Sequence, residues 1–110
     1  MFNRSFTTSI LLAAALCAFA YAQEKPIGQF ESHEDVGNPA KPGSVVYDAA
    51  KQTYAITGSG VNMWAGRDEF HYVWMRMKGN FILRARVEFL GKGVDPHRKI
   101  GWIARHSLEA

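Results

Sequence analysis

The 110 residues are enough for one small domain but not for two, and 47% of them are hydrophobic. The formal net charge of +3 comes from 13 basic and 10 acidic residues, with no run of five like charges. This mild, dispersed excess gives no signature of a nucleic-acid partner, which would require a clustered basic surface.

The first 22 residues have the pattern of a cleavable secretory signal peptide. Arg4 supplies a positive charge, an apolar run follows from 10 to 20, and Ala20-Tyr21-Ala22 gives the small-x-small pattern that signal peptidase recognises. These 11 apolar residues are too few for a transmembrane helix, which needs about 20. We therefore predict cleavage after Ala22, no membrane span after cleavage, and a periplasmic or secreted mature chain that starts at Gln23.

Cys17 is the only cysteine and lies five residues before the predicted cut, so the mature chain has no disulfide framework. Attachment of lipid to Cys17 is the competing interpretation. It is disfavoured because Leu16 stands where lipid-attachment motifs require a small side chain.

Prolines and glycines interrupt residues 23–43, so neither helical nor strand periodicity runs through this segment. We predict an extended lead-in here, with one short strand around 27–30. The remainder, 44–110, is predicted to be the domain itself.

The first predicted hairpin of the domain consists of two β-rich runs, at 44–47 and 53–57. The five residues 48–52 between them have the length of a hairpin loop. Gly58-Ser59-Gly60 ends the second run.

Residues 69–90 carry the clearest local pattern, because two long β-rich runs flank Gly79-Asn80. A two-residue turn with glycine first is what a type II′ hairpin requires. That turn would place one set of apolar side chains on a single face: Phe70, Tyr72, Trp74, Phe81, Leu83, Val87 and Phe89. The opposite face would pair Met77 with Ile82, Met75 with Arg84, Val73 with Arg86 and His71 with Glu88. We expect this hairpin to form the core, followed by a third strand over 99–106.

About five strands are predicted in all, whereas a two-sheet sandwich usually has seven or more. The mature chain has no stretch that predicts an amphipathic helix of three turns. The pattern therefore predicts an all-β, antiparallel β-sandwich that is incomplete. Its open sheet edges would be covered by further strands of a longer protein or by self-association.

Four stretches carry a resemblance to a known family: Asn62-Met63-Trp64, Asp68-Glu69-Phe70-His71, 78–87 and 91–102. Through them, residues 27–110 resemble the N-terminal concanavalin A-like domain of bacterial TolB-like periplasmic proteins, often labelled biopolymer transporters. The resemblance implies a β-sandwich of the jelly-roll type. In that family the module continues into further strands and then a β-propeller, so the resemblance also implies a truncated module.

Two patterns could indicate an enzyme. His71 opposite Glu88 could be an acid/base pair, but no nucleophile or second carboxylate shares that face, so a stabilising cross-strand pair is favoured. Asp68, Glu69 and Asp95 could supply the carboxylates of a glycosidase, but Asp68 and Glu69 are adjacent, and adjacent strand residues point to opposite faces. The Glu-x-Asp-x-x-Glu pattern of concanavalin-like glycosidases does not occur. We therefore expect no enzymatic activity.

Trp64 is the best candidate for ligand binding, because it lies in the loop between Gly58 and Asp68 and flat rings stack on sugars. Burial in the core is an equally weighted reading of Trp64, and it is the favoured one for Tyr72 and Trp74. For His33, a solvated acidic loop is favoured over a metal site, since no second ligand stands at a fixed spacing. No cofactor or metal is expected. The full set of candidate ligand-binding residues is Asn62, Trp64, Arg67, Asp68, His71, Arg84, Arg86, Glu88 and His97.

The sequence thus predicts an exported, non-catalytic binding or interaction module of the cell envelope, which holds a glycan or packs on a TolB-like β-propeller. Two alternatives remain open: a carbohydrate-active hydrolase, and a structural fragment with no activity of its own.

Overall fold

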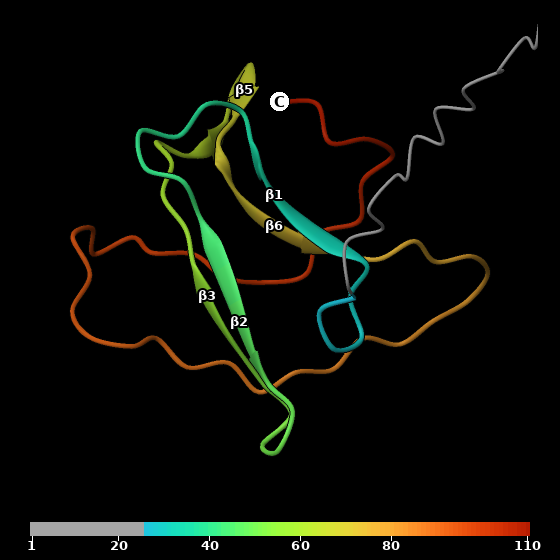
Figure 1. Ribbon diagram of the computed structural model, residues 1–110. Helices are drawn as coiled ribbons and strands as arrows, with labels where there is room; N and C mark the ends of the chain where they lie inside the picture. The colour runs from blue at the N-terminus through green and yellow to red at the C-terminus, as the bar shows by residue number, and fades with distance from the viewer. Residues whose placement is uncertain (1–25) are drawn as a thin grey trace, which may run out of the picture.

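The computed structural model describes residues 26–110, so the predicted signal peptide and its cleavage site lie outside the described residues. The described chain is all-β, without a helix, and its strands form three two-stranded antiparallel sheets. Figure 1 shows two of these sheets, β1–β6 and β2–β3, and β5 near the C-terminus. Between residues 26 and 110, no helix is long and apolar enough to cross a membrane.

The predicted first hairpin is confirmed. β2 (Ser44–Asp48) pairs antiparallel with β3 (Thr53–Thr57), from Ser44 opposite Thr57 to Asp48 opposite Thr53. Asp48 closes the loop, because its Oδ1 accepts hydrogen bonds from the backbone N–H groups of Ala50 and Lys51 at 3.0 and 3.1 Å. This is the local side-chain capping that makes aspartate frequent at turns.

The second sheet joins residues far apart in the sequence. β1 (Ser32–Val36) pairs antiparallel with β6 (Phe70–Trp74), from Ser32 opposite Trp74 to Val36 opposite Phe70. Val36 is the one fully buried large side chain among the described residues. The segment predicted as a lead-in therefore contributes a strand to the domain. That strand does not lie at 27–30, where Ile27 and Phe30 instead exchange backbone hydrogen bonds of 2.9 and 3.0 Å in a tight turn.

The predicted hairpin over 69–90 is wrong. β6 lies in its first half, but its partner is β1, and no strand is assigned from 75 to 110. Gly79 does adopt a positive φ of 77°, as the turn prediction requires, but it belongs to the segment after β6, which has no strand and leads away from the sheet (Figure 1). β1 displaces the second half of the predicted hairpin because it pairs its backbone with β6 and also carries Asp35, which binds His71.

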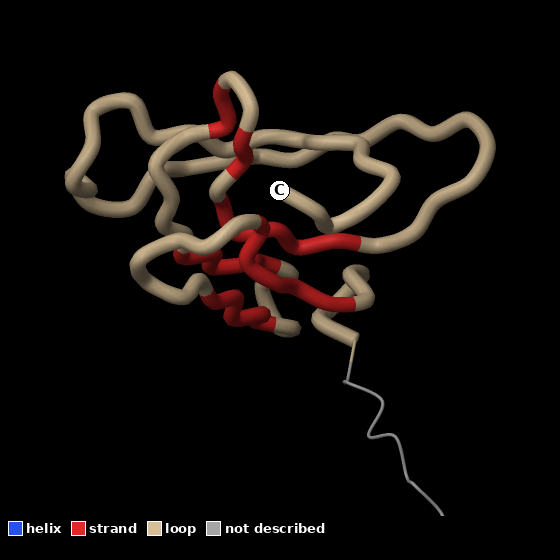
Figure 2. The backbone as a smooth tube through the Cα atoms, turned by 90° about the horizontal axis from the view of Figure 1, so that it is seen from above, coloured by secondary structure: helices blue, strands red, loops and turns tan. Residues whose placement is uncertain are grey.

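The predicted strand over 99–106 is also wrong, although this segment does return to β6. Its contact is made by a side chain, because the Tyr72 hydroxyl donates a 2.8 Å hydrogen bond to the Ile103 carbonyl. Figure 2 shows the longer strands in its lower half and the long loop segments in its upper half, where a short pair of strand segments also lies.

As a result, the apolar face predicted for 69–90 does not form one core. Phe70, Tyr72 and Trp74 on β6 are half-buried, whereas Phe81, Val87 and Phe89 are exposed. The described residues are compatible with a β-sandwich, but their apolar side chains in 81–102 are largely uncovered.

The third sheet is a minimal hairpin. β4 (Met63–Trp64) pairs with β5 (Arg67–Asp68), and Ala65 and Gly66 form the turn. Ala65 has a φ of +60°, a conformation that costs a non-glycine residue on the order of 1 kcal/mol. We call residues 63–68 the Trp64 hairpin.

Candidate functional site

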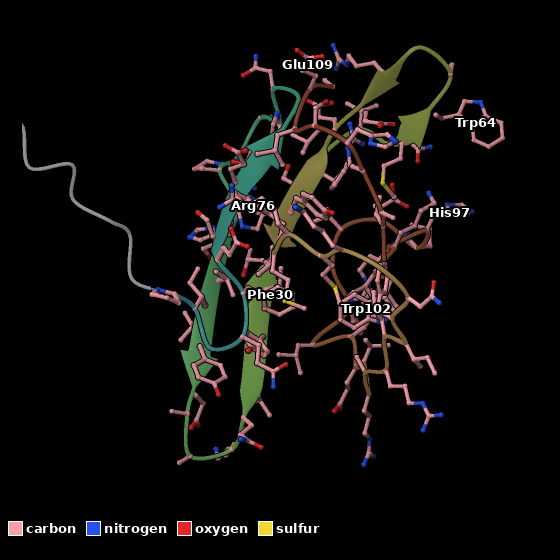
Figure 3. The ribbon with its side chains drawn as sticks, turned by 90° about the vertical axis from the view of Figure 1, so that its right-hand side faces the viewer. Phe30, Trp64, Arg76, His97, Trp102 and Glu109 are labelled. Atoms are coloured by element: carbon pink, nitrogen blue, oxygen red, sulfur yellow. The ribbon has the colours of Figure 1, made fainter. Side chains whose placement is uncertain are left out.

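The Trp64 hairpin presents its tryptophan to solvent. Trp64 is 79% exposed, and Figure 3 shows its ring projecting from the edge of the molecule. Tryptophan usually buries most of its large apolar surface, so an indole held in water at a turn is available for contact with a ligand.

A buried carboxylate holds the base of the Trp64 hairpin. The Glu69 side chain is only 4% exposed, and its Oε2 accepts hydrogen bonds from the Val61 N–H at 3.2 Å and the Arg67 guanidinium at 3.0 Å. The Glu69 N–H in turn donates to the Asn62 carbonyl at 3.0 Å. A Cβ at Gly60 would lie 1.9 Å from the Glu69 carbonyl oxygen, so the chain needs glycine there. These contacts fix both ends of the hairpin, because a buried carboxylate must keep its partners.

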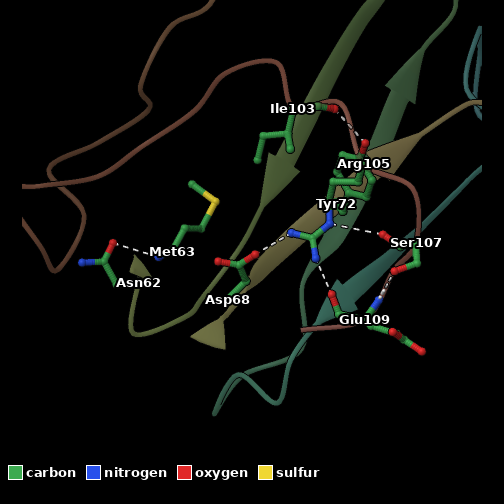
Figure 4. Close-up of polar contacts among 8 residues, drawn as sticks. All are labelled: Asn62, Met63, Asp68, Tyr72, Ile103, Arg105, Ser107 and Glu109. Atoms are coloured by element: carbon green, nitrogen blue, oxygen red, sulfur yellow. Dashed lines mark hydrogen bonds and ion pairs between the residues drawn. The ribbon is translucent and has the colours of Figure 1, made fainter. Parts of the chain in front are cut away.

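Arg105 attaches the C-terminal segment to the same hairpin (Figure 4). Its guanidinium donates to Asp68 Oδ2 at 2.6 Å and to the Ser107 carbonyl at 3.2 Å, and it also contacts the Glu109 carbonyl. A depression of about 250 Å³ lies beside this contact and is lined by Ala65, Gly66, Arg67, Asp68, Arg105 and Ala110.

One cation at this surface has an uncharged partner. Lys99 Nζ donates to Asn62 Oδ1 at 3.0 Å, whereas Arg67 and Arg105 are paired with the carboxylates of Glu69 and Asp68. The Asn62 side chain also accepts the Met63 N–H at 2.9 Å, which orients its amide. An aromatic ring, an amide and an ammonium group are therefore grouped on and beside the Trp64 hairpin.

A second polar cluster lies between β1 and β6. His71 Nδ1 donates to Asp35 Oδ1 at 2.7 Å, and His71 Nε2 lies 2.9 Å from His33 Nδ1. The His71 side chain is 2% exposed, and the Asp35 side chain is 24% exposed. Asp35 also accepts the Gly43 N–H on both carboxylate oxygens, at 3.1 and 3.0 Å.

The Asp35 carboxylate is stabilised in its charged form. The hydrogen bond from His71 and then that from the Gly43 N–H lower the pKa of Asp35 below its ordinary value, against a smaller opposing effect of desolvation. We call Asp35, His71 and His33 the histidine relay, because two hydrogen bonds link them in a row.

The predicted site residues therefore separate into groups. Asn62, Trp64, Arg67 and Asp68 lie together, as their spacing suggests. The predicted pairing of His71 with Glu88 is wrong, because His71 pairs with Asp35, directly opposite it in the sheet. The exposed residues of the loop 75–110 include the other four candidates: Arg84, Arg86, Glu88 and His97.

His97 contacts Asp95 in its own loop. The His97 N–H donates to Asp95 Oδ1 at 2.7 Å, and this hydrogen bond lowers the pKa of Asp95. Figure 3 shows His97 and Trp64 on the same side of the molecule.

Sequence reasoning missed Arg105 as a site residue, and it treated His33 and Asp35 as parts of a solvated loop. The sequence does contain a pattern that places His33 and Asp35 in a strand. His33 and Asp35 are two residues apart, so on a strand their side chains share one face, next to a histidine on the pairing strand.

Comparisons with known proteins identify no relative: no protein-family model matches the chain, and neither does any curated protein or solved structure. Within residues 26–110, no group of three or more His, Cys, Asp or Glu side chains is arranged to hold a metal ion.

Proposed function

We propose that this chain is an exported, non-catalytic binding module of the cell envelope that contacts a glycan through the Trp64 hairpin. The observation that carries the proposal is the exposure of Trp64 on a hairpin whose ends are fixed by hydrogen bonds to the buried Glu69 carboxylate. The TolB-like resemblance supports a concanavalin A-like sandwich of the jelly-roll type, a fold whose loops commonly bear the ligand site.

The chemistry of the Trp64 hairpin suits a sugar. The flat indole face can stack on the C–H groups of a pyranose ring, which removes apolar surface of both partners from water. The Asn62 amide and the Lys99 ammonium lie next to it and can donate hydrogen bonds to hydroxyl groups.

The carboxylates near Trp64 support binding without catalysis. A glycosidase needs one carboxyl group to give a proton and a second to attack or activate water. Here Asp68 is bound by Arg105 at 2.6 Å, and Glu69 is buried against Arg67. Both carboxylates are therefore engaged in ion pairs that hold the hairpin in place.

The test is titration of the exported chain with envelope and extracellular polysaccharide fragments, measured by calorimetry. Trp64→Ala should weaken binding about fivefold or more, since loss of one stacked ring removes on the order of 1 kcal/mol or more. Trp64→Phe should retain part of the affinity. Ile82→Ala is the control, because Ile82 is also exposed, at 80%, and lies outside the hairpin. Equal binding by Trp64→Ala and the parent would refute this site.

A second function, packing on another domain, is favoured by a different observation. Eight large apolar side chains between residues 81 and 102 are about half or more exposed: Phe81, Ile82, Val87, Phe89, Leu90, Val94, Ile100 and Trp102. So many exposed large apolar side chains in one segment are typical of an interface. We propose that a TolB-like β-propeller is the partner, as the family resemblance suggests. A purified propeller of that family should slow amide exchange over 81–90, and Leu90→Glu should abolish the effect.

A further inference from the structure

The histidine relay has a limited capacity for protons. His71 Nδ1 must carry a proton to donate to Asp35. The 2.9 Å contact between His71 Nε2 and His33 Nδ1 is a hydrogen bond only when one of these two nitrogens, and not both, carries a proton. With both histidines neutral, His33 donates to His71. With one added proton, either ring carries the positive charge and the contact survives. A second added proton would place N–H groups on both facing nitrogens, and the contact would be lost.

The packing around His71 restricts which ring can move. A Cβ at Gly43 would lie 2.1 Å from His71 Nδ1, and a Cβ at Gly58 would lie 3.1 Å from His71 Cβ, so the Gly43 backbone lies close to the ring and the Gly58 backbone lies close to the base of the side chain. His33 is only half-buried, on β1. Relief of the repulsion must therefore come from His33 leaving His71.

From this geometry we infer that the histidine relay is an acid-operated latch: His33 fastens β1 to β6 near neutral pH and is released when both histidines are protonated. Imidazole is the side chain whose charge ordinarily changes between about pH 5 and 8. The released state binds one proton more than the latched state, so falling pH favours release.

Few other titratable groups of the described chain lie near the two histidines, so their protonation controls the release. The described polar contacts of His71 with titratable side chains are those with Asp35 and His33, both on β1, and the backbone of Gly43 and Gly58 also lies close to His71. The ion pair of Glu31 with Arg76, 2.8 Å apart, lies beyond the Ser32–Trp74 end of the same sheet.

The latch can be tested on the exported chain by hydrogen exchange, with protection factors corrected for the intrinsic pH dependence of exchange. Protection over Ser32–Val36 and Phe70–Trp74 should fall about tenfold per pH unit as acid drives release, because release takes up one proton. His33→Gln should abolish this slope, since a glutamine amide can donate or accept but cannot gain a charge. His97→Gln, at an exposed histidine paired with Asp95, should leave the slope unchanged.

Ring-nitrogen NMR shifts of the unmodified chain give a second readout, in case His33→Gln fails to fold. The latch predicts two separate protonation steps, of which the second coincides with the loss of protection. Simultaneous protonation of both rings with full protection, or an undiminished slope in His33→Gln, would overturn the proposal.

Discussion

Replacement of Gly43 by alanine tests the packing around the histidine relay most directly. The added Cβ would lie 2.1 Å from His71 Nδ1, 2.2 Å from Cγ and 2.7 Å from Cβ. Ordinary contacts between carbon atoms are about 3.5 to 4.0 Å, so the ring or the loop must move by more than about 1 Å. Such a shift breaks the 2.7 Å hydrogen bond of His71 to Asp35, or the two bonds from the Gly43 N–H.

The expected destabilisation follows from these losses. Overpacking costs about 1 to 3 kcal/mol, and loss of a hydrogen bond to a charged group costs about 1.5 to 3 kcal/mol. Restriction of the unfolded chain by alanine offsets about 0.4 to 1 kcal/mol. We therefore expect Gly43→Ala to lower the free energy of unfolding by about 2 to 4 kcal/mol.

Urea unfolding followed by tryptophan fluorescence measures this change. Gly66→Ala is the matched control, because a Cβ there meets nothing within 4 Å, so its stability should equal or slightly exceed that of the parent. If Gly43→Ala unfolds at the same urea concentration as Gly66→Ala, His71 does not occupy the place between β1 and the Gly43 backbone that this reasoning requires.

Three further predictions address other parts of the molecule. Mass spectrometry of the exported protein should find Gln23 as the mature N-terminus, and an intact Met1 on the exported form would contradict the signal-peptide prediction. Asp35→Asn should lower stability near pH 7 by about 1.5 to 3 kcal/mol, which is the usual contribution of a hydrogen bond to a charged group. The lowered pKa of Asp35 means that its stabilisation is present above the unfolded pKa of about 3.9 and is lost as pH falls through the folded value, so the difference from the parent in a urea melt should shrink below about pH 4. Purified residues 23–110 should self-associate in size-exclusion chromatography with light scattering, because Ile82 and Leu90 are 80% and 75% exposed, and a monomer with a sharp cooperative melt would refute this.

The parts of the fold that could be predicted from the sequence are those set by neighbouring residues. Strands β2 and β3 are adjacent, β-rich and joined by a short loop that Asp48 closes, so local pattern is sufficient. β1 and β6 are separated by more than 30 residues, and their pairing depends on contacts between side chains that no local pattern contains. The turn at Gly79 was predicted with the correct sign of φ, yet a turn does not oblige the flanking runs to pair.

The candidate site divides in the same way, because its local members were found and its distant partners were not. Asn62, Trp64, Arg67 and Asp68 lie within seven consecutive residues, so a single hairpin brings them together. Their partners Lys99 and Arg105 come from more than 30 residues away. A charged residue in a loop has many possible partners of opposite sign, and only the fold selects one. The tryptophan can therefore be proposed as a site residue from the sequence alone. The charged groups that surround it, and so the choice among ligands, depend on how the C-terminal segment packs against the hairpin.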